Sequence, residues 1–373
     1  MAEITLILLA AGSSTRFNCD VKKQWLRIGH RPLWQYVARK CVETKLFDKI
    51  IITSSSDDIE FMKNYDSFTF VEGSTTRQNS LKNALAEVET DYVLVSDIAR
   101  SCINEDFLKK IISKKGEADC IVPYLKVSDT IVYENETIDR DKVKRIQTPQ
   151  LSRTSILKDS LNTDKEFTDE SSAIVANGGT REFILGDSEA NKITFLSDLN
   201  QLSCLSKPSN DTLSGTGFDV HAFDETTQMY LCGVKIDSDF GFKAHSDGDV
   251  AIHALIDALL GAAGMGDIGM MFPDSSDEYK DIDSKILLQR VANKIYSFGF
   301  IIINVDVTIA AETPRIGKYK LQMRKTIAEI LNCDSSRVNI KATTTEKLGF
   351  IGRSEGVGVI ANANLKYFDW TKI

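Results

Sequence analysis

The sequence has 373 residues, of which 42% are hydrophobic and 26% charged, a composition typical of globular proteins and a length sufficient for two domains. The net charge of −8 argues against nonspecific binding to nucleic acid or to an anionic membrane. No segment approaches the roughly 18 apolar residues of a membrane span, and none of the seven cysteines forms a C-x-x-C pair, so we expect a cytoplasmic protein with free thiols and no membrane partner.

Apolar strands alternate with helices through the first half of the chain. The pattern predicts strands at Ile4–Leu9, Lys49–Thr53, Tyr92–Ser96 and Asp119–Pro123, and helices at Leu33–Glu43, Ser80–Val88 and Phe107–Lys114. This alternation is typical of an α/β fold with a doubly wound, mostly parallel sheet. The polar segment Thr130–Gln147 interrupts the alternation with short β-rich pieces around a turn at 134–136, and we expect a protruding β-arm there.

A second domain is expected after a linker. Because Ser203–Ser214 is rich in Ser, Asn, Asp and Pro, we place the first domain at residues 1–205, the linker at 206–213 and the second domain at 214–373. The second half predicts an α+β domain, with strands at Gly215–Val220, Met229–Val234, Asn304–Ile309 and Val338–Thr343, and helices at Asp249–Ala262, Ser284–Phe298 and Lys318–Leu331.

The first predicted strand runs into a loop of small residues, Ala10, Ala11 and Gly12. Backbone N–H groups in such a loop can bind phosphate oxygens. Arg16 and Lys23 follow, and their charges could stabilise a triphosphate in a transition state. The loop is neither a Walker A motif nor a dinucleotide fingerprint. A tight turn beside ordinary surface cations is the alternative.

Further polar motifs follow in the first half. The segment GSTTRQNS (73–80) precedes a predicted helix, and Asp97 ends a predicted strand, where open α/β sheets bind ligands and metals. TPQ (148–150), TDESS (168–172) and Lys192 come later. Together with AAGSSTR and SDIAR, this series resembles the 2-C-methyl-D-erythritol 4-phosphate cytidylyltransferases, which are nucleotidyltransferases with a Rossmann-like sheet, across residues 3–200.

The resemblance implies transfer from CTP, with Mg²⁺ or Mn²⁺, to a sugar phosphate by positioning and charge stabilisation. It implies transition-state stabilisation by Arg16 and Lys23, binding of methylerythritol phosphate by Arg140, Thr168 and Lys192, metal binding at Asp97, cytosine recognition at Ser80, and phosphate binding at Ala10, Ala11 and Gly12.

Several family positions differ in this sequence. Lys22 stands where proline is usual, Ser74–Thr75 replaces the usual Gly-Asp, and Ser96 replaces histidine. These departures leave two alternatives for the first half, a noncatalytic scaffold or a transferase for another sugar phosphate. The five charged residues carried over by position are all present: Arg16, Lys23, Asp97, Arg140 and Lys192.

Three of the four histidines lie close together in the second half. Asp219 and His221 are two residues apart in a predicted strand, so their side chains point to the same face. His253, on the following helix, could complete a metal site of one carboxylate and two imidazoles, with a fourth position open on Zn²⁺. Asp257, one helical turn further, could orient an imidazole. The alternative is that these are packed or surface histidines.

Two long motifs carry a second resemblance. HSDGDVAIHALIDALLGAAGMGDIG and NIKATTTEKLGF resemble 2-C-methyl-D-erythritol 2,4-cyclodiphosphate synthase, across residues 213–370. The resemblance implies Zn²⁺ bound by Asp219, His221 and His253, transition-state stabilisation by His245 and Thr344, Mg²⁺ or Mn²⁺ at Glu346, a cytosine pocket at Ala311–Gly317, and substrate contacts in the motifs that contain Asp267, Gly269, Phe272, Asp274, Thr343, Phe350 and Arg353.

The two resemblances together imply a bifunctional enzyme of isoprenoid-precursor synthesis. One half would transfer CMP from CTP to 2-C-methyl-D-erythritol 4-phosphate with release of pyrophosphate. The other would cyclise 4-CDP-2-C-methyl-D-erythritol 2-phosphate with release of CMP. The expected partners are small phosphorylated substrates, cytidine nucleotides and further copies of the chain, as trimeric cyclase domains and dimeric transferase domains that could form a hexamer.

Overall fold

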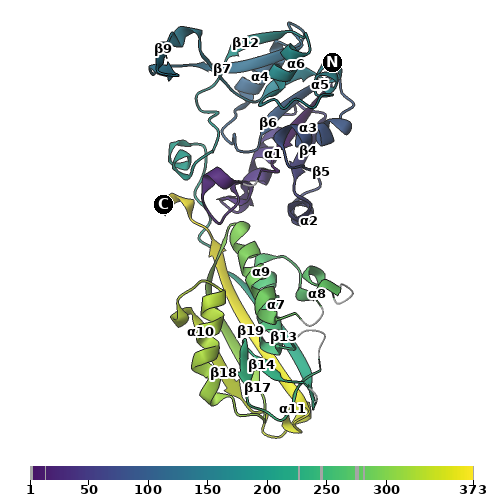
Figure 1. Ribbon diagram of the computed structural model, residues 1–373, viewed down its shortest axis with the longest axis vertical. Helices are drawn as coiled ribbons and strands as arrows, with labels where there is room; N and C mark the ends of the chain where they lie inside the picture. The colour runs from purple at the N-terminus through teal and green to yellow at the C-terminus, as the bar shows by residue number, and fades with distance from the viewer. Residues whose placement is uncertain are drawn as a thin grey trace. The chain divides into compact units, whose positions relative to one another are not determined.

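The computed structural model describes residues 3–12, 14–225, 227–243, 247–273, 277–279 and 282–372. The chain divides into two compact units, one of Met1–Pro208 with Asp369–Ile373 and one of Ser209–Phe368 (Figure 1). The sequence predicts the last residues in the second domain, and the structure corrects this. Trp370 is buried, and its indole Nε1 donates a hydrogen bond to the carbonyl of Arg27, 2.8 Å away.

The first unit is built on an eight-stranded sheet of order β10-β7-β11-β6-β1-β4-β5, with β12 beside β7. Four parallel strands confirm the predicted α/β fold: β1 (Ile4–Leu9), β4 (Lys49–Ser54), β5 (Thr69–Glu72) and β6 (Tyr92–Asp97). β12 also runs parallel to β7. The remaining strands are β7 (Cys120–Lys126), β10 (Lys144–Ile146), β11 (Gln150–Arg153) and β12 (Arg181–Leu185), and β11 runs antiparallel to β6. A small separate hairpin consists of β2 (Arg27–Ile28) and β3 (Arg31–Pro32).

Helices cover this sheet because its central strands are apolar on both faces. Every residue of β1 and of β6 is buried. Ile7 and Val95 belong to one hydrophobic cluster with residues of α3 (Arg77–Ala86), α5 (Thr154–Ser160) and α6 (Glu170–Ala176). The other helices of the unit are α1 (Leu33–Glu43), α2 (Ser56–Tyr65) and α4 (Glu105–Ser113).

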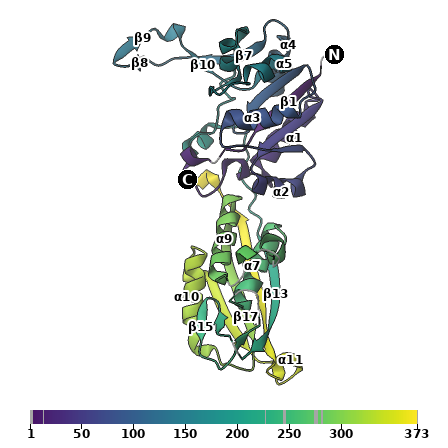
Figure 2. The same ribbon diagram turned by 45° about the vertical axis from the view of Figure 1, so that its right-hand side comes forward.

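The predicted β-arm is confirmed as a hairpin of β8 (Ile131–Tyr133) and β9 (Glu136–Ile138). Glu134 and Asn135, with φ of 49° and 69°, form its turn in the left-handed conformation that a tight hairpin requires. Figure 2 shows the hairpin extending away from the rest of the first unit.

The second unit confirms the predicted α+β class. Its five-stranded sheet has the order β16-β13-β19-β17-β18, with β13 (Leu213–Asp224), β16 (Gly241–Phe242), β17 (Phe300–Ala310), β18 (Val338–Thr343) and β19 (Gly356–Tyr367). The helices are α7 (Val250–Ala263), α9 (Ser284–Ser297) and α10 (Lys320–Ile330), with the short α8 (Ile268–Met271) and α11 (Gly349–Gly352). The backbone of α7 lies directly against Gly215 and Gly217 of β13.

One predicted strand of the second unit is wrong. Met229–Val234 is not a single strand but the start of a hairpin, β14 (Met229–Leu231) and β15 (Val234–Ile236). Cys232 and Gly233 have φ of 51° and 73°, so the chain reverses between them. Asp249, which caps α7, accepts both of their N–H groups.

The expectation of free thiols is wrong for two cysteines. Cys102 and Cys204 form a disulfide within the first unit, whereas the five others are free. The pairing could not be inferred from spacing, because 102 residues separate the two and only the fold brings them together. Among the described helices, none has the length and apolar character to cross a bilayer.

Candidate active sites

A cavity of about 460 Å³ opens in the first unit at the carboxyl ends of β1 and β6. This volume falls within the range that binds small-molecule ligands. The predicted phosphate loop lines it together with the charged residues of later segments. Eight of the residues proposed from the sequence meet there: Ala10, Ala11, Gly12, Arg16, Lys23, Ser80, Asp97 and Lys192.

Two lysines of the cavity, Lys23 and Lys192, lie close enough for the charge of one to affect the pKa of the other. Lys192 Nζ lies 2.7 Å from Asp97 Oδ2, and Lys23 Nζ donates to the carbonyl of Ile193 at 3.2 Å. Burial of Lys23, and then the nearby charges of Lys192 and Arg16, lower the pKa of its ammonium group. The cavity therefore holds several cations close together, and an anionic ligand would reduce the repulsion between them.

Asp58 fixes the turn that carries Lys23, and sequence reasoning missed it. Its carboxylate is 1% exposed and accepts hydrogen bonds from Lys22 Nζ at 2.6 Å, Gln24 Nε2 at 3.0 Å and Trp25 Nε1 at 3.1 Å. The lysine that replaces the family's usual proline thus has a defined partner. The three bonds orient the short helix Lys23–Trp25 from one buried carboxylate.

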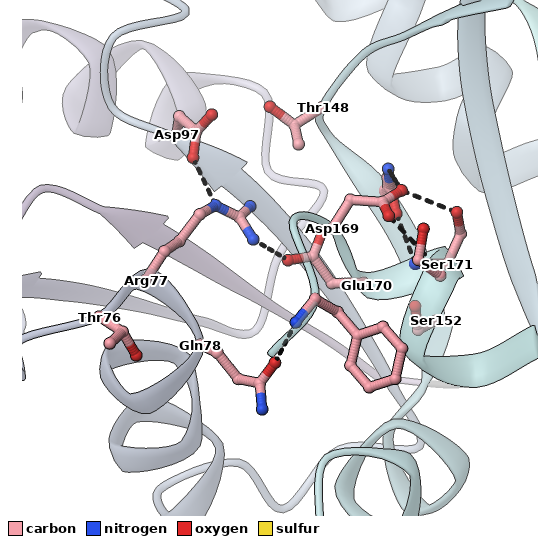
Figure 3. Close-up of polar contacts among 12 residues, drawn as sticks. Thr76, Arg77, Gln78, Asp97, Thr148, Ser152, Asp169, Glu170 and Ser171 are labelled. Carbon is pink, nitrogen blue, oxygen red and sulfur yellow. Dashed lines mark hydrogen bonds and ion pairs between the residues drawn. The ribbon is translucent and has the colours of Figure 1, made fainter. Parts of the chain in front are cut away.

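Two further charged residues at the cavity were also missed, Arg77 and Glu170. Arg77 Nε donates to Asp97 Oδ1 at 3.1 Å, and Arg77 Nη1 lies 2.6 Å from Glu170 Oε1 (Figure 3). Burial disfavours the charge on Asp97, but Arg77 and Lys192 outweigh it and hold the pKa of Asp97 well below its usual range. Arg77 belongs to the motif GSTTRQNS and Glu170 to the motif TDESS. Their places in these motifs were the features of the sequence that could have indicated both residues.

Ser80 organises the loop beside the cavity. Its hydroxyl accepts the N–H of Ser74 at 2.9 Å and lies 2.9 Å from the carbonyl of Thr76. Arg140 and Thr168 are placed differently from the other predicted residues. Both are exposed, neither belongs to the lining of the cavity, and Arg140 donates to the carbonyl of Ser128 beside the arm at 2.6 Å.

A second, smaller cavity of about 290 Å³ shares Lys192 with the first. It is lined by Arg100, Arg145 and polar groups that include Asn191 and Thr194. Arg100 is held in place by Thr148 Oγ1 at 2.8 Å and by the carbonyl of Ala190 at 2.7 Å. Three cations, Arg100, Arg145 and Lys192, outnumber the one carboxylate of the lining, Asp198, and this balance favours an anionic ligand.

In the second unit, the ligand atoms of Asp219, His221 and His253 all lie within 4.8 Å of one another. Asp219 Oδ2 is 3.6 Å from His221 Nε2 and 3.3 Å from His253 Nδ1. Bonds of about 2.0–2.1 Å to a tetrahedral metal separate two ligand atoms by about 3.3–3.4 Å. The three side chains therefore fit a metal ion of this geometry.

The outer nitrogens of both imidazoles have partners. His221 Nδ1 lies 3.1 Å from the carbonyl of Gly248, so this nitrogen carries the proton and Nε2 offers a lone pair. His253 Nε2 lies 3.0 Å from Ser284 Oγ, whose own proton goes to Asp247 Oδ1 at 2.5 Å. Burial lowers the pKa of His221, which favours the neutral imidazole that binds metal.

The predicted role of Asp257 is corrected by these contacts. Its carboxylate accepts the N–H of Ile268 at 2.8 Å and so supports the start of α8. Ser284 takes the position beside the imidazole of His253 instead. Ser284 opens a different helix, α9, so no spacing along α7 could have revealed it.

The other predicted cyclase residues lie in several places. Asp267 caps α8, which contains Gly269, and Phe272 is buried against Tyr279 with ring centroids 5.3 Å apart. Phe350 is in α11, and Arg353 Nε donates to Glu355 at 2.8 Å. His245 and Asp274 lie outside the described residues.

A second cluster forms where β17 and β18 end. Thr344 Oγ1 donates to Glu346 Oε1 at 3.0 Å, and Ala311 N–H donates to the carbonyl of Thr343 at 3.0 Å, so the predicted cytosine segment begins beside the predicted catalytic loop. Glu312, missed in the sequence, anchors this loop by accepting the N–H groups of Thr345 and Lys347 at 3.1 Å each.

This cluster and the metal-binding group lie apart on the sheet. Strand pairing aligns Thr343 with Ala310, Gly358 and Val220 in one row across β18, β17, β19 and β13. Three inter-strand spacings, roughly 14 Å, therefore separate Thr343 from the metal-binding strand. Within one chain, the metal-binding group and the cluster around Thr344 and Glu346 therefore do not form a single site.

Comparison with known proteins gives consistent matches to both halves. The family model for 2-C-methyl-D-erythritol 4-phosphate cytidylyltransferase matches residues 4–205, and the YgbB family model matches residues 213–366. The chain is 71% identical to the bifunctional enzyme IspD/IspF of Sulfurimonas denitrificans, over 99% of this chain and 96% of that protein. It is 53% identical to the enzyme of the same name from Aliarcobacter butzleri, over the full length of both. The solved structure of bifunctional IspDF from Campylobacter jejuni is 47% identical, covers 99% of this chain and 100% of its own, and has a TM-score of 0.91.

Proposed function

Since the chain belongs to the family of bifunctional enzymes that join a 2-C-methyl-D-erythritol 4-phosphate cytidylyltransferase to a 2,4-cyclodiphosphate synthase, we propose how its residues divide the two reactions. The first unit transfers CMP from CTP to methylerythritol phosphate and releases pyrophosphate. The second cyclises the 2-phosphorylated CDP derivative and releases CMP. The cyclase substrate carries a 2-phosphate that the transferase product lacks, so a phosphorylation must intervene between the two reactions.

The observation that carries the transferase assignment is that the phosphate loop, Lys23, Ser80, Asp97 and Lys192, which are far apart in the sequence, line one cavity. The loop at 10–12 binds the triphosphate through its N–H groups other than that of Ala10, which donates to the carbonyl of Thr53. Arg16 and Lys23 stabilise the charge that develops at the α-phosphate. The Asp97 carboxylate, at a strand end, offers oxygen to the Mg²⁺ or Mn²⁺ that accompanies CTP, and this ion supplies charge neutralisation when bound. Ser80 shapes the loop that receives the base.

The methylerythritol phosphate binds in the adjoining cationic cavity. Lys192 lines both cavities and so stands where the two substrates meet. Arg140 and Thr168 are exposed and line neither cavity of their own chain, which supports a dimer in which each arm serves the partner's site. Contacts across such a dimer bring the attacking phosphate oxygen into line with the α-phosphate of CTP.

Pyrophosphate release tests the transferase assignment. With CTP, Mg²⁺ and methylerythritol phosphate, the wild-type chain is expected to release pyrophosphate, and Lys23→Ala is expected to abolish release while CMP release from the cyclase substrate continues. Equal loss of both activities would indicate misfolding instead. Release with another nucleotide but not with CTP would contradict the specificity.

The cyclase assignment is carried by the group of Asp219, His221 and His253. We propose that it binds Zn²⁺, because one carboxylate and two neutral imidazoles leave an open position as in catalytic zinc sites. Bound zinc would act as a Lewis acid on the β-phosphate. Thr344, with His245, stabilises the transition state, Glu346 helps to hold Mg²⁺ or Mn²⁺ between the phosphates, and the segment Ala311–Gly317 receives the cytosine.

His253→Ala tests the metal assignment. Loss of one of three ligands is expected to remove zinc from the purified protein and to abolish CMP release, while pyrophosphate release continues. Metal analysis by mass spectrometry measures the first effect directly. Zinc content equal to that of the wild-type protein would show that this ligand set is wrong.

Separation of the two cyclase clusters within one chain supports a trimer in which neighbouring copies complete each site. Trimeric cyclase units and dimeric transferase units combine most simply in a hexamer. The mass of the assembly in solution measures this, and a monomer with full cyclase activity would contradict it.

A further inference from the structure

A chain of four charged side chains begins in the transferase cavity, which Lys192, Asp97 and Arg77 line, and ends at the buried Glu170. Lys192 contacts Asp97 at 2.7 Å. Asp97 contacts Arg77 at 3.1 Å, and Arg77 contacts Glu170 at 2.6 Å (Figure 3). The four residues come from four separate segments of the first unit. Only Lys192 and Asp97 have a proposed part in the reaction, which leaves Arg77 and Glu170 to be explained.

Glu170 is buried too deeply to bind a substrate. Its side chain is 0% exposed, and this burial raises the pKa of Glu170, while the adjacent guanidinium of Arg77 opposes the rise and favours the carboxylate. Among the described residues, Glu170 Oε2 has no hydrogen-bond partner. A buried carboxylate is costly unless a cation stays beside it, so Glu170 ties Arg77 to one position. Arg77 consequently cannot move to follow a ligand as a surface arginine would.

Both residues are also fixed by the helices that carry them. Arg77 opens α3, whose cap Thr76 accepts the N–H of Asn79 at 3.1 Å. Glu170 opens α6, whose cap Asp169 accepts the N–H of Ser172 at 3.2 Å. The pair therefore joins the starts of two helices in front of the strand that ends at Asp97.

The two oxygens of Asp97 are held differently. Oδ1 receives the fixed guanidinium of Arg77, whereas Oδ2 receives the ammonium of Lys192, a flexible side chain that is 32% exposed. The flexible Lys192 can leave Asp97 to bind the phosphate of a substrate. The guanidinium of Arg77 cannot leave without removing the cation that compensates the buried charge of Glu170. Oδ2 is thus the oxygen that can exchange its lysine partner for another ligand.

We propose that Arg77, anchored by Glu170, is a positioning residue that fixes the carboxylate of Asp97 so that Oδ2 is presented to the divalent cation bound with CTP. The pair sets the direction of the metal ligand and does not itself contact the reacting atoms. This inference rests on the proposed transferase function and on Asp97 as its metal ligand. It adds a residue pair to which neither resemblance nor position assigned a role.

Glu170→Gln tests the inference because it keeps the shape of the side chain and removes its charge. Binding of Mn²⁺ in the presence of CTP, without the sugar phosphate, is measured by electron paramagnetic resonance. We expect Mn²⁺ affinity and kcat for pyrophosphate release each to fall about 10- to 100-fold, as when a group that orients a metal ligand is lost. At saturating metal, the KM for CTP is expected to change little, since the pair is proposed to act on the metal ligand and not on the nucleotide.

Three controls accompany this variant. Asp97→Asn gives the background from Mn²⁺ bound elsewhere in the chain. Glu105→Gln removes the carboxylate of an exposed pair with Lys109, 2.7 Å away in the same unit, and is expected to change nothing. CMP release by the same chain reports that the second unit remains folded, and thermal unfolding of the variant reports on the first unit.

A double variant separates positioning from a purely structural role. Replacing both members of a buried ion pair by apolar residues commonly restores stability, so Arg77→Met with Glu170→Leu is expected to unfold at the wild-type temperature. Mn²⁺ affinity and kcat are expected to remain low in it. If Mn²⁺ affinity and kcat recovered in the double variant together with its stability, the inference would be overturned. Wild-type Mn²⁺ binding in Glu170→Gln would overturn it as well. Absence of pyrophosphate release from the wild-type chain would instead contradict the transferase assignment.

Discussion

The chemistry of Lys23 depends on groups far from it in the sequence. Asp58 holds the turn that carries Lys23, and Lys192 and Arg16 place positive charge near its ammonium group. Burial and these charges lower the pKa of Lys23, so its ammonium group loses its proton at a lower pH than an ordinary lysine does. The proposed role of Lys23 needs the protonated form, which predominates only below this lowered pKa.

Lys23→Arg tests this dependence. Pyrophosphate release by the wild-type enzyme is expected to fall as pH rises through the lowered pKa of Lys23, and the arginine variant is expected to keep its remaining activity to higher pH, because a guanidinium stays protonated. The measurement is a pH profile of kcat/KM on the alkaline side. An identical alkaline decline in both proteins would assign the titration to another group.

Motif order in the sequence identified Arg16, Lys23, Asp97 and Lys192, and the cavity contains all four. The residues that hold them in place, Asp58, Arg77 and Glu170, could not be identified in the same way. Their roles consist of contacts between residues 20 to 93 positions apart in the chain. Ser284 in the second unit was missed for the same reason.

At the scale of elements, α7 packs closely on β13 in the second unit. A Cβ atom on Gly215 or Gly217 would meet the backbone of α7 at Ala258 or Ala254. The strand can approach the helix only because these two positions lack side chains. The same strand carries Asp219 and His221, so this contact sets where the metal-binding group lies relative to His253 on α7.

Gly217→Ala is expected to destabilise the second unit, because the clash is with backbone that cannot yield. Overpacking of this kind costs about 1–3 kcal/mol or more. Thermal unfolding and CMP release measure the effect, and pyrophosphate release is expected to persist. Gly261→Ala is the matched control on the facing helix. Its nearest neighbour is 4.0 Å away, so it is expected to be neutral or to stabilise α7 by about 0.5–1 kcal/mol. Equal effects of the two changes would contradict the packing argument.

At the scale of the whole molecule, the chain leaves the first unit after Pro208 and returns to it at Asp369. The start of β13 pairs with the end of β19, Leu213 with Leu365, so both connections leave the second unit at neighbouring strand ends. The returning segment is held by Trp370, which is 4% exposed and bonded to the carbonyl of Arg27.

Trp370→Ala is expected to destabilise the first unit although it lies at the far end of the sequence. Truncation of a buried tryptophan costs about 3–5 kcal/mol, whereas Trp370→Phe keeps most of the packing and loses one hydrogen bond of about 1 kcal/mol. Denaturant unfolding followed by pyrophosphate release measures both variants. Unchanged stability of the alanine variant would mean that the tail packs on the first unit without supporting it.

The sequence by itself determined the fold class of each half, the two family assignments and the spacing that points to a metal-binding group. Those features depend on short periodic patterns and on contiguous motifs, which neighbouring residues specify locally. Only the tertiary structure decided that Cys102 meets Cys204, that Trp370 belongs with Arg27, and that Arg77 and Glu170 stand behind Asp97. Each of these is a contact between segments distant in the chain, and such contacts exist only once the sheets and helices have packed.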